Sequence, residues 1–262
     1  MAFVADVLGG ILADKAIRLQ DEQARESLEH LRERALERMD RRRPFVFRLQ
    51  QAAKPAVIAE IKRASPSAGV IASTFDPQAI ARDYETAGAD AISVLTEQDH
   101  FYGDLSHLDL VRAVTTLPLL RKDFVWTPYQ VAQSAAYGAD CVLLIAAALG
   151  DDALNACLSE ARAYNLDALV EVHNASELRR AAAAGADLIG VNNRDLRTLQ
   201  VDLSIGEMLL PDVPAGVFAV AESGVRTAAD AERLRKAGAD AFLVGEALMR
   251  CADPVNLLRS LR

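Results

Sequence analysis

The sequence predicts an α/β protein, a (β/α)8 TIM barrel with an N-terminal helical extension. Two observations carry this prediction. Short apolar runs alternate with helical patterns rich in alanine and charged residues. In addition, the phrase Ala-Gly-Ala-Asp, once as Tyr-Gly-Ala-Asp, recurs at 87–90, 137–140, 184–187 and 237–240, each time before an apolar run. The interval of roughly fifty residues suits about two strand–helix units, and the glycine suits the C-terminus of a helix.

The start of the chain stands outside this alternation. Residues 14–43 form a long, highly charged helical pattern, which we expect to pack on one end of the barrel. The segment "DRRRPFVF", 40–47, then connects into the barrel. The prediction is therefore a single barrel domain over 1–262, of which about 1–50 is the N-terminal extension.

Eight apolar runs follow as predicted strands. They are 56–62, 91–95, 118–124, 141–147, 167–172, 188–192, 217–223 and 241–245. Helical segments lie between them, and 253–262 closes the chain as a further helix. Strands that are apolar almost throughout are typical of a parallel sheet covered by helices, and eight such units close most naturally into a barrel. A doubly wound open sheet is the alternative, but no Gly-x-Gly-x-x-Gly follows the first run.

The composition limits the partners and the compartment. The 262 residues carry a formal net charge of −8 with a pI near 5.1, which argues against a nucleic-acid or anionic-membrane partner. The three cysteines are odd in number and lack CxxC spacing, as expected for thiols in a reducing cytoplasm. Residues 1–15 resemble a signal peptide, but they lack a basic leading region, and Asp6 and Asp14 interrupt the apolar run. No stretch is long and apolar enough to cross a membrane, so we predict a cytoplasmic protein.

Polar residues gather at the predicted C-terminal strand ends, where such barrels place their active sites. They are Glu60, Lys62, Lys122, Asp123, Glu171, Asn192, Arg194, Glu222 and Glu246. Any one of these residues alone would be interpreted as a solvated residue at the rim. Glu60 and Lys62 could equally form a structural ion pair. Polar residues at six strand ends together favour a charged cavity, since the opposite strand ends carry no comparable set of polar residues. We expect Asp123 to point outward toward the helices.

Other polar residues receive less specific predictions. His173 and Asn193 read as loop or helix-cap residues. The remaining histidines show no metal-ligand spacing, so we infer no metal site. "ESG" at 222–224 and "VGEALM" at 244–249 place small residues before helical starts, which suits the phosphate site that such barrels form after strands seven and eight. The alternative is that Gly224 and Gly245 serve only as turn residues.

Several motifs together resemble one family. "VIAEIKRASPSAGVI", "SVLTEQDHFYGDLSHL", "LVEVHNASEL", "IGVNNRDL" and "AESGVRTAADAERLRKAGADAFLVGEALMR" look like indole-3-glycerol-phosphate synthase, and the resemblance covers essentially the whole chain. It implies ring closure, decarboxylation and dehydration of 1-(2-carboxyphenylamino)-1-deoxyribulose 5-phosphate to indole-3-glycerol phosphate, a step of tryptophan biosynthesis. It also implies a phosphorylated small-molecule substrate, no cofactor and a monomer.

The resemblance further implies roles for individual residues. Lys122 would be the general acid of ring closure, with a pKa that a crowded, partly desolvated site can lower. Lys62 would be the second ammonium, which steers the substrate and assists loss of the hydroxyl. Glu171 and Glu60 would both matter as bases, with their division of steps left open. Asn192 would bind substrate hydroxyls.

The remaining implied roles concern binding. Arg194 would brace the site, Phe124 would flank the anthranilate ring, and Glu222 would orient a lysine. The phosphate would be surrounded by Ser65, Ser223, Gly224 and Gly245. Glu246 lies next to that site, and we expect its carboxylate to point away from the dianion while its backbone N–H stays available.

The sequence departs from the family pattern at Ala221, where serine is common, and at Trp126 and Thr127, where an aliphatic residue and an acid are frequent. None of these residues has an implied proton-transfer role. Two other functions compete. A phosphoribosyl isomerase-type barrel needs an Asp pair or Cys with Asp, and a non-catalytic phosphate-ligand-binding barrel needs no set of two lysines and two glutamates. The set Lys62, Lys122 and Glu171 therefore disfavours both.

Overall fold

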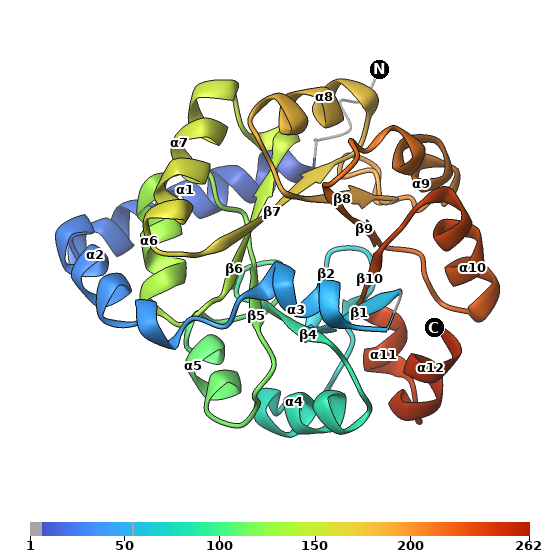
Figure 1. The fold of residues 1–262 in the computed structure, drawn as a ribbon. Coiled ribbons are helices and arrows are strands. Elements are labelled where there is room, and N and C mark those ends of the chain that lie inside the picture. The colour runs from blue at the N-terminus through green and yellow to red at the C-terminus, as the bar shows by residue number, and fades with distance from the viewer. Residues whose placement is uncertain (1–6, 54) are drawn as a thin grey trace, which may run out of the picture.

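The computed structural model describes residues 7–53 and 55–262, so the predicted interruption of the N-terminal apolar run at Asp6 lies outside the described residues. Eight parallel strands form a closed barrel in the order β1-β10-β9-β8-β7-β6-β5-β4 (Figure 1). The strands are β1 Ala56–Ile61, β4 Ala91–Leu95, β5 Leu119–Lys122, β6 Cys141–Ile145, β7 Asp167–Val172, β8 Leu188–Asn192, β9 Phe218–Glu222 and β10 Ala241–Val244. The predicted barrel is confirmed, and β4, β7 and β8 have the predicted bounds.

Helices follow the strands and cover the outside of the barrel. They are α4 Pro77–Thr86, α5 Ser106–Arg112, α6 Pro128–Ala136, α7 Asp151–Ala163, α8 Ala175–Ala183, α9 Ser204–Leu209, α10 Ala228–Ala237, α11 Glu246–Arg250 and α12 Pro254–Ser260, with short 3-10 turns at Ala146–Ala148 and Leu210–Asp212. Five of these helices are capped at the N-terminus by side chains, those of Asp76, Thr127, Asn174, Thr227 and Asp253. The glycines of the repeated phrase all have positive φ, as expected for residues that end helices.

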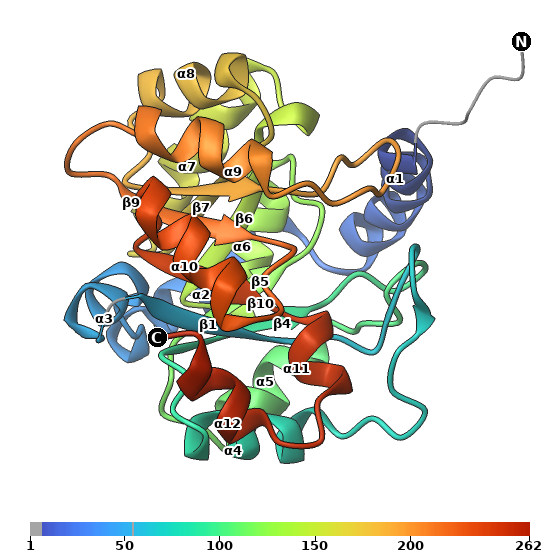
Figure 2. The same cartoon turned by 90° about the vertical axis from the view of Figure 1, so that its right-hand side faces the viewer.

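The N-terminal extension runs along the barrel rather than packing on one end of it, so that expectation was wrong. Its helices are α1 Val7–Arg25, α2 Leu28–Glu37 and α3 Phe45–Gln51, with a 3-10 turn at Met39–Arg41. Figure 2 shows α1 and α3 at opposite ends of the barrel, and α2 packs against α6 between them. The reason is that each helix has its own apolar stripe, separated from the next by charged residues, and each stripe is buried against a different part of the barrel.

The apolar core has an outer layer between strands and helices and an inner layer within the barrel. Phe45 and Leu49 of α3 close the bottom of the inner layer, and Leu8 and Ile11 of α1 join it near the mouth. A two-stranded hairpin, β2 Ala64–Ser65 and β3 Gly69–Val70, follows β1 and was not predicted. All three cysteines are free thiols. Within 7–53 and 55–262, no helix is long and apolar enough to span a membrane.

Carboxylates also occupy the bottom of the barrel, although the sequence showed no set of polar residues there comparable to that at the mouth. Asp140 accepts hydrogen bonds from the backbone N–H groups of Leu119 (2.9 Å) and Arg43 (2.8 Å), and it pairs with Arg112 at 2.9 Å. Asp90 and Asp240 accept from the backbone in the same way. These residues end the repeated phrase, which was interpreted only as the end of a helix before a strand. Each one also binds the backbone of the neighbouring strand.

Candidate active site

The charged residues of the mouth continue the inward-facing rows of the strands. Because side chains alternate between the two faces of a strand, Glu60 follows Ile58 into the barrel, Lys122 follows Leu120, and Glu171 follows Leu169. The apolar members of these rows belong to the inner core. The charged members line a cavity at the C-terminal strand ends, together with Asn192, Arg194 and Glu222. The structure therefore brings together the side chains that the sequence placed at one mouth.

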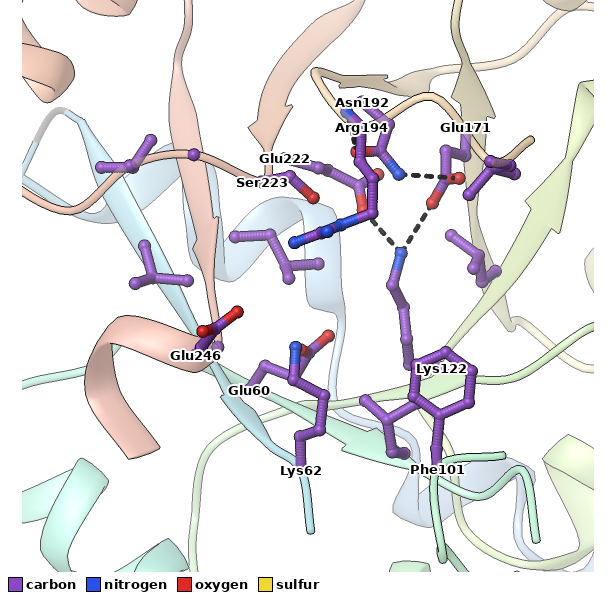
Figure 3. Close-up of a pocket in the computed structure, with 18 of the residues that line it drawn as sticks. Glu60, Lys62, Phe101, Lys122, Glu171, Asn192, Arg194, Glu222, Ser223 and Glu246 are labelled. Carbon is purple, nitrogen blue, oxygen red and sulfur yellow. Dashed lines mark hydrogen bonds and ion pairs between the residues drawn. The ribbon is translucent and has the colours of Figure 1, made fainter. Parts of the chain in front are cut away.

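Lys122 lies at the centre of the cavity between two carboxylates (Figure 3). Its Nζ is 2.7 Å from Oε2 of Glu171 and 2.6 Å from Oε2 of Glu222. Burial opposes the charge of this lysine, but the two carboxylates outweigh burial and raise the pKa of Lys122 above its ordinary value. The expected lowering of that pKa is therefore corrected: the crowding comes from opposite charges, which favour the ammonium.

The two carboxylates that share Lys122 have different surroundings. Oε1 of Glu171 accepts a hydrogen bond from Nδ2 of Asn192 at 3.0 Å and lies 3.3 Å from Nε2 of His173. Oε1 of Glu222 is buried and has no hydrogen-bond partner among the described residues. Burial raises the pKa of Glu222 to about 8, helped by the charge of Glu171 and opposed by Lys122. Burial also acts on Glu171, but Lys122 and His173 hold the pKa of that carboxyl well below its usual range.

Glu60 and Lys62 form a second ion pair at the mouth. Nζ of Lys62 is 2.7 Å from Oε1 of Glu60, and both side chains line the same cavity as Lys122. A Cβ atom at Gly245 would collide with Oε1 of Glu60. Glycine at this position, directly after β10, is therefore required for the close approach of Glu60 and is more than a turn residue.

Asn192 and Arg194 connect the mouth to the loop after β8. The backbone N–H of Arg194 donates to Oδ1 of Asn192 at 3.0 Å, which orients the amide toward Glu171. The guanidinium of Arg194 donates to the carbonyl of Leu199 (2.9 Å) and to Oγ of Ser67 (3.3 Å) in the loop after β1. Ser65 does not join Ser223 and Gly224; it lies in a smaller adjoining pocket, where its Oγ accepts from the backbone N–H of Ala68.

The loops after β9 and β10 border the cavity with small residues. Ser223 and Gly224 have φ values of 61° and 87°, and a Cβ at Gly224 would collide with Leu203. Asn193, expected in a loop or cap role, is fully buried and ties this segment together: its Nδ2 donates to the carbonyls of Glu222 (2.9 Å) and Ser223 (3.0 Å). Glu246 lines the cavity, with Oε1 bound to Nε of Arg250 on its own helix at 3.2 Å.

An apolar wall completes the cavity. Phe124 packs near Phe101 with ring centroids 6.2 Å apart, and Leu143 and Leu196 lie on the same wall. Phe101 was missed as a site residue, although it stands within one of the quoted motifs. Asp123, adjacent to Phe124, points away from the cavity as predicted and pairs with Lys15 and Arg121 at 2.8 Å and 2.9 Å.

His173 is the second residue that sequence reasoning missed. It follows β7 and was assigned a loop or cap role, yet it is packed directly against the carboxylate of Glu171. The available signal was its spacing: two residues after Glu171, it belongs to the same row of side chains. Across the described part of the chain, no group of three or more His, Cys, Asp or Glu side chains is arranged to hold a metal ion.

Comparisons with known proteins point to one family. The family model described as indole-3-glycerol phosphate synthase matches residues 8–261. A relative from Parafrankia sp. (strain EAN1pec), named indole-3-glycerol phosphate synthase, is 48% identical over all of this chain and 95% of its own length. Indole-3-glycerol phosphate synthase 1 of Streptomyces coelicolor is 44% identical, also over all of this chain and 95% of its own length.

Solved structures with low sequence identity share the fold. 3-Hexulose-6-phosphate synthase from Salmonella typhimurium superposes with a TM-score of 0.64 at 14% identity, covering 79% of this chain and 96% of that one. A mandelate oxidase mutant with an FMN adduct gives a TM-score of 0.60 at 21% identity, covering 80% and 72%. These likenesses establish the barrel alone. The family model and the full-length relatives establish more: the chain belongs to the indole-3-glycerol phosphate synthase family.

Proposed function

We propose that this cavity converts 1-(2-carboxyphenylamino)-1-deoxyribulose 5-phosphate to indole-3-glycerol phosphate, with Lys122 as the general acid and Glu171 as the base. The observation that carries the proposal is the ammonium of Lys122 held between Glu171 and Glu222, 2.7 Å and 2.6 Å away, beside an apolar wall. Acid–base chemistry at neutral pH needs two groups whose surroundings push their pKa values apart, and these two carboxylates meet that need.

Ring closure begins when the aromatic carbon that bears the carboxylate attacks the ketone of the sugar chain. The ketone oxygen gains negative charge, and the ammonium of Lys122 donates a proton to it. Glu222 supports this step, because a carboxyl group with a pKa of about 8 carries a proton at neutral pH and lies 2.6 Å from the lysine nitrogen. Glu222 then returns a proton to the amine of Lys122.

Decarboxylation and dehydration follow from the same groups. Loss of CO2 restores part of the conjugation of the ring. Glu171, held ionised by Lys122, then removes a proton from carbon, while the ammonium of Lys62 donates a proton to the hydroxyl, which leaves as water. Glu60 holds the ammonium of Lys62 in place at 2.7 Å. The two glutamates therefore have different roles: Glu171 abstracts the proton, and Glu60 supports Lys62.

Binding uses the rest of the cavity. The phosphate contacts the backbone around Ser223, Gly224 and Gly245, where small residues leave the N–H groups accessible. The aromatic ring lies against Phe124 and Phe101. Asn192 and Arg194 bind the sugar hydroxyls and the carboxylate. Ser65 contributes through the loop after β1, whose Ser67 is already bound to Arg194.

The proposal extends to the form of the protein. We infer that residues 1–262 act as one domain, as a monomer in the cytoplasm and without a cofactor. The packing of the extension against both ends of the barrel and the three free thiols support this. Light scattering at assay concentration tests the monomer directly.

The test of the function is an indole assay. Purified protein is mixed with the substrate, and indole fluorescence and CO2 release are followed together. We expect a rise that depends on the protein and falls by about 10²–10⁴-fold in Glu171→Gln, the range for loss of a general base. Glu232→Gln, the same change at an exposed glutamate of α10, serves as the matched control and retains activity. Folded wild-type protein that binds the substrate without forming indole would favour a non-catalytic phosphate-binding barrel.

A further inference from the structure

His173 lies behind the proposed base, on the side away from Lys122. Its Nε2 is 3.3 Å from Oε1 of Glu171, and its Nδ1 is 3.2 Å from Oε2 of Glu177 on α8. The imidazole thus forms ion-pair contacts with two carboxylates, although its Nε2 makes no aligned hydrogen bond within the described residues, and it is largely buried, with 13% of its side chain exposed. Glu177 is itself fixed: it accepts from the backbone N–H of His173 at 2.8 Å and from Nδ2 of Asn174.

The charges around Lys122 leave a question that His173 answers. One ammonium faces two buried carboxylates, Glu171 and Glu222, at nearly equal distances. Lys122 alone therefore gives no reason for either carboxylate to be the ionised one. Glu171 differs from Glu222 in having a second cationic partner and an amide donor, Asn192, whereas Oε1 of Glu222 lacks a hydrogen-bond partner within the described residues.

We propose that His173 is a positioning residue that makes Glu171, rather than Glu222, the base of the reaction. As an imidazolium held by Glu177, it supplies positive charge to Glu171 and to no other carboxylate of the mouth. This inference rests on the proposed function. His173 does not touch the substrate; it acts through Glu171.

The charged groups that face His173 come from two elements. Glu171 is on β7 and Glu177 is on α8, and Lys122 of β5 reaches only the far oxygen of Glu171. Burial disfavours the imidazolium, but the two carboxylates raise the pKa of His173 to about 10. His173 is therefore charged throughout the working range of a cytoplasmic enzyme, and its contribution to Glu171 does not switch off near neutral pH.

A competing explanation is purely structural. Glu177 accepts a hydrogen bond from the backbone of His173 at the start of α8, so the pair could serve only to cap that helix. Glutamine at position 177 can still accept this hydrogen bond through its amide oxygen, but it carries no charge. Glu177→Gln therefore preserves the cap and weakens the imidazolium.

The decisive experiment is the pH dependence of kcat/KM for indole formation in His173→Gln, Glu177→Gln and the double variant. Removal of the positive charge raises the pKa of Glu171. On acidification, the base of the variant therefore becomes protonated at a higher pH than that of the wild type. We expect the acid limb of His173→Gln to move up by about one pH unit or more, with about a tenfold loss of kcat/KM for each unit below the new limb. His107→Gln, at a half-buried histidine on α5, is the matched control and leaves the limb unchanged.

The other two variants separate the explanations. Glu177→Gln should shift the limb in the same direction by less, and the double variant should match His173→Gln, because Glu177 acts through the histidine. An unshifted acid limb in folded His173→Gln, or additive effects in the double variant, would overturn the proposal. If His173→Gln does not fold, Glu177→Gln alone decides by the presence or absence of its shift.

A second readout does not depend on activity. In 15N spectra of the imidazole groups, the resonance lost in His173→Gln should remain that of an imidazolium to above about pH 8 in the wild type. A neutral imidazole at pH 7 would contradict the inference. Wild-type protein without indole formation would instead refute the proposed function, and the spectra would still report on His173.

Discussion

The two ends of the barrel bury the same kinds of charge and use them differently. At the bottom, the carboxylate of Asp140 is satisfied by two backbone N–H groups and by Arg112. At the mouth, Glu171 and Glu222 compete for the single ammonium of Lys122, and one oxygen of Glu222 has no partner within the part of the chain that the structure describes. A buried charge stabilises only when its hydrogen bonds are complete.

This difference indicates where the fold tolerates a buried carboxylate whose hydrogen bonds are incomplete. The bottom carboxylates tie the start of one strand to the next, and Asp140 also binds the segment before α3. Their removal leaves buried N–H groups without acceptors, and removal of Asp140 leaves Arg112 without its carboxylate partner. The mouth carboxylates sit where a substrate completes the missing contacts. Stability therefore depends on the bottom, and turnover on the mouth, which is the division that barrels of this kind follow.

The largest expected effect is at the mouth. Lys122→Ala removes the proton donor of ring closure, so kcat should fall by about 10²–10⁴-fold. Binding of the substrate, which depends on the loops after β9 and β10, should persist and can be measured by titration calorimetry. A variant that keeps wild-type turnover would show that another group supplies the proton.

A bottom carboxylate should cost stability instead. Asp140→Ala leaves Arg112 without its buried partner and the N–H of Leu119 without an acceptor, which we expect to lower the free energy of unfolding by about 3–5 kcal/mol. Denaturant unfolding followed by circular dichroism measures this change. Asp151→Ala, at an exposed carboxylate paired with Arg180, is the control and should change stability by about 1 kcal/mol or less. Equal losses in the two variants would remove the contrast between buried and exposed pairs.

The smallest expected effect is the pH dependence of stability at Glu222. Its pKa of about 8 in the folded protein lies above the ordinary value of 4.5. The stabilisation from its protonated form is therefore complete below about pH 4.5 and is lost as pH rises through about 8. Glutamine mimics the protonated form at every pH. Glu222→Gln should thus match the wild type at about pH 4 and have the higher Tm at about pH 9, as measured by calorimetry. A Tm difference that does not change with pH would contradict this.

Sequence reasoning reached much of the molecule, because periodicity carries most of the information about a barrel. The predicted strand ends placed Glu60, Lys122 and Glu171 at one mouth, and the structure puts all three in one cavity. The bottom carboxylates were missed because Asp140 looks like any turn residue until the neighbouring strand is aligned beside it. Register across strands is not visible in one sequence.

The failures at the mouth have a similar cause. The pKa of Lys122 was expected to fall because the sequence does not show which side chains face it. Its two carboxylate partners lie 49 and 100 residues away in the chain. His173, by contrast, was interpreted only as a cap, although its spacing two residues after Glu171 could have placed it beside that carboxylate. The extension was placed at one end because the separate burial of its three helices is a tertiary property.

The division between the two ends can be tested most directly by one assay on two variants. Turnover per folded molecule is measured at saturating substrate for Lys122→Ala and for Asp140→Ala, with the folded fraction taken from the unfolding curves. We expect the mouth variant to lose at least about a hundredfold and the bottom variant to stay within about twofold of the wild type. Comparable losses of turnover in both variants would show that the charges at the two ends do not divide catalysis and stability between them.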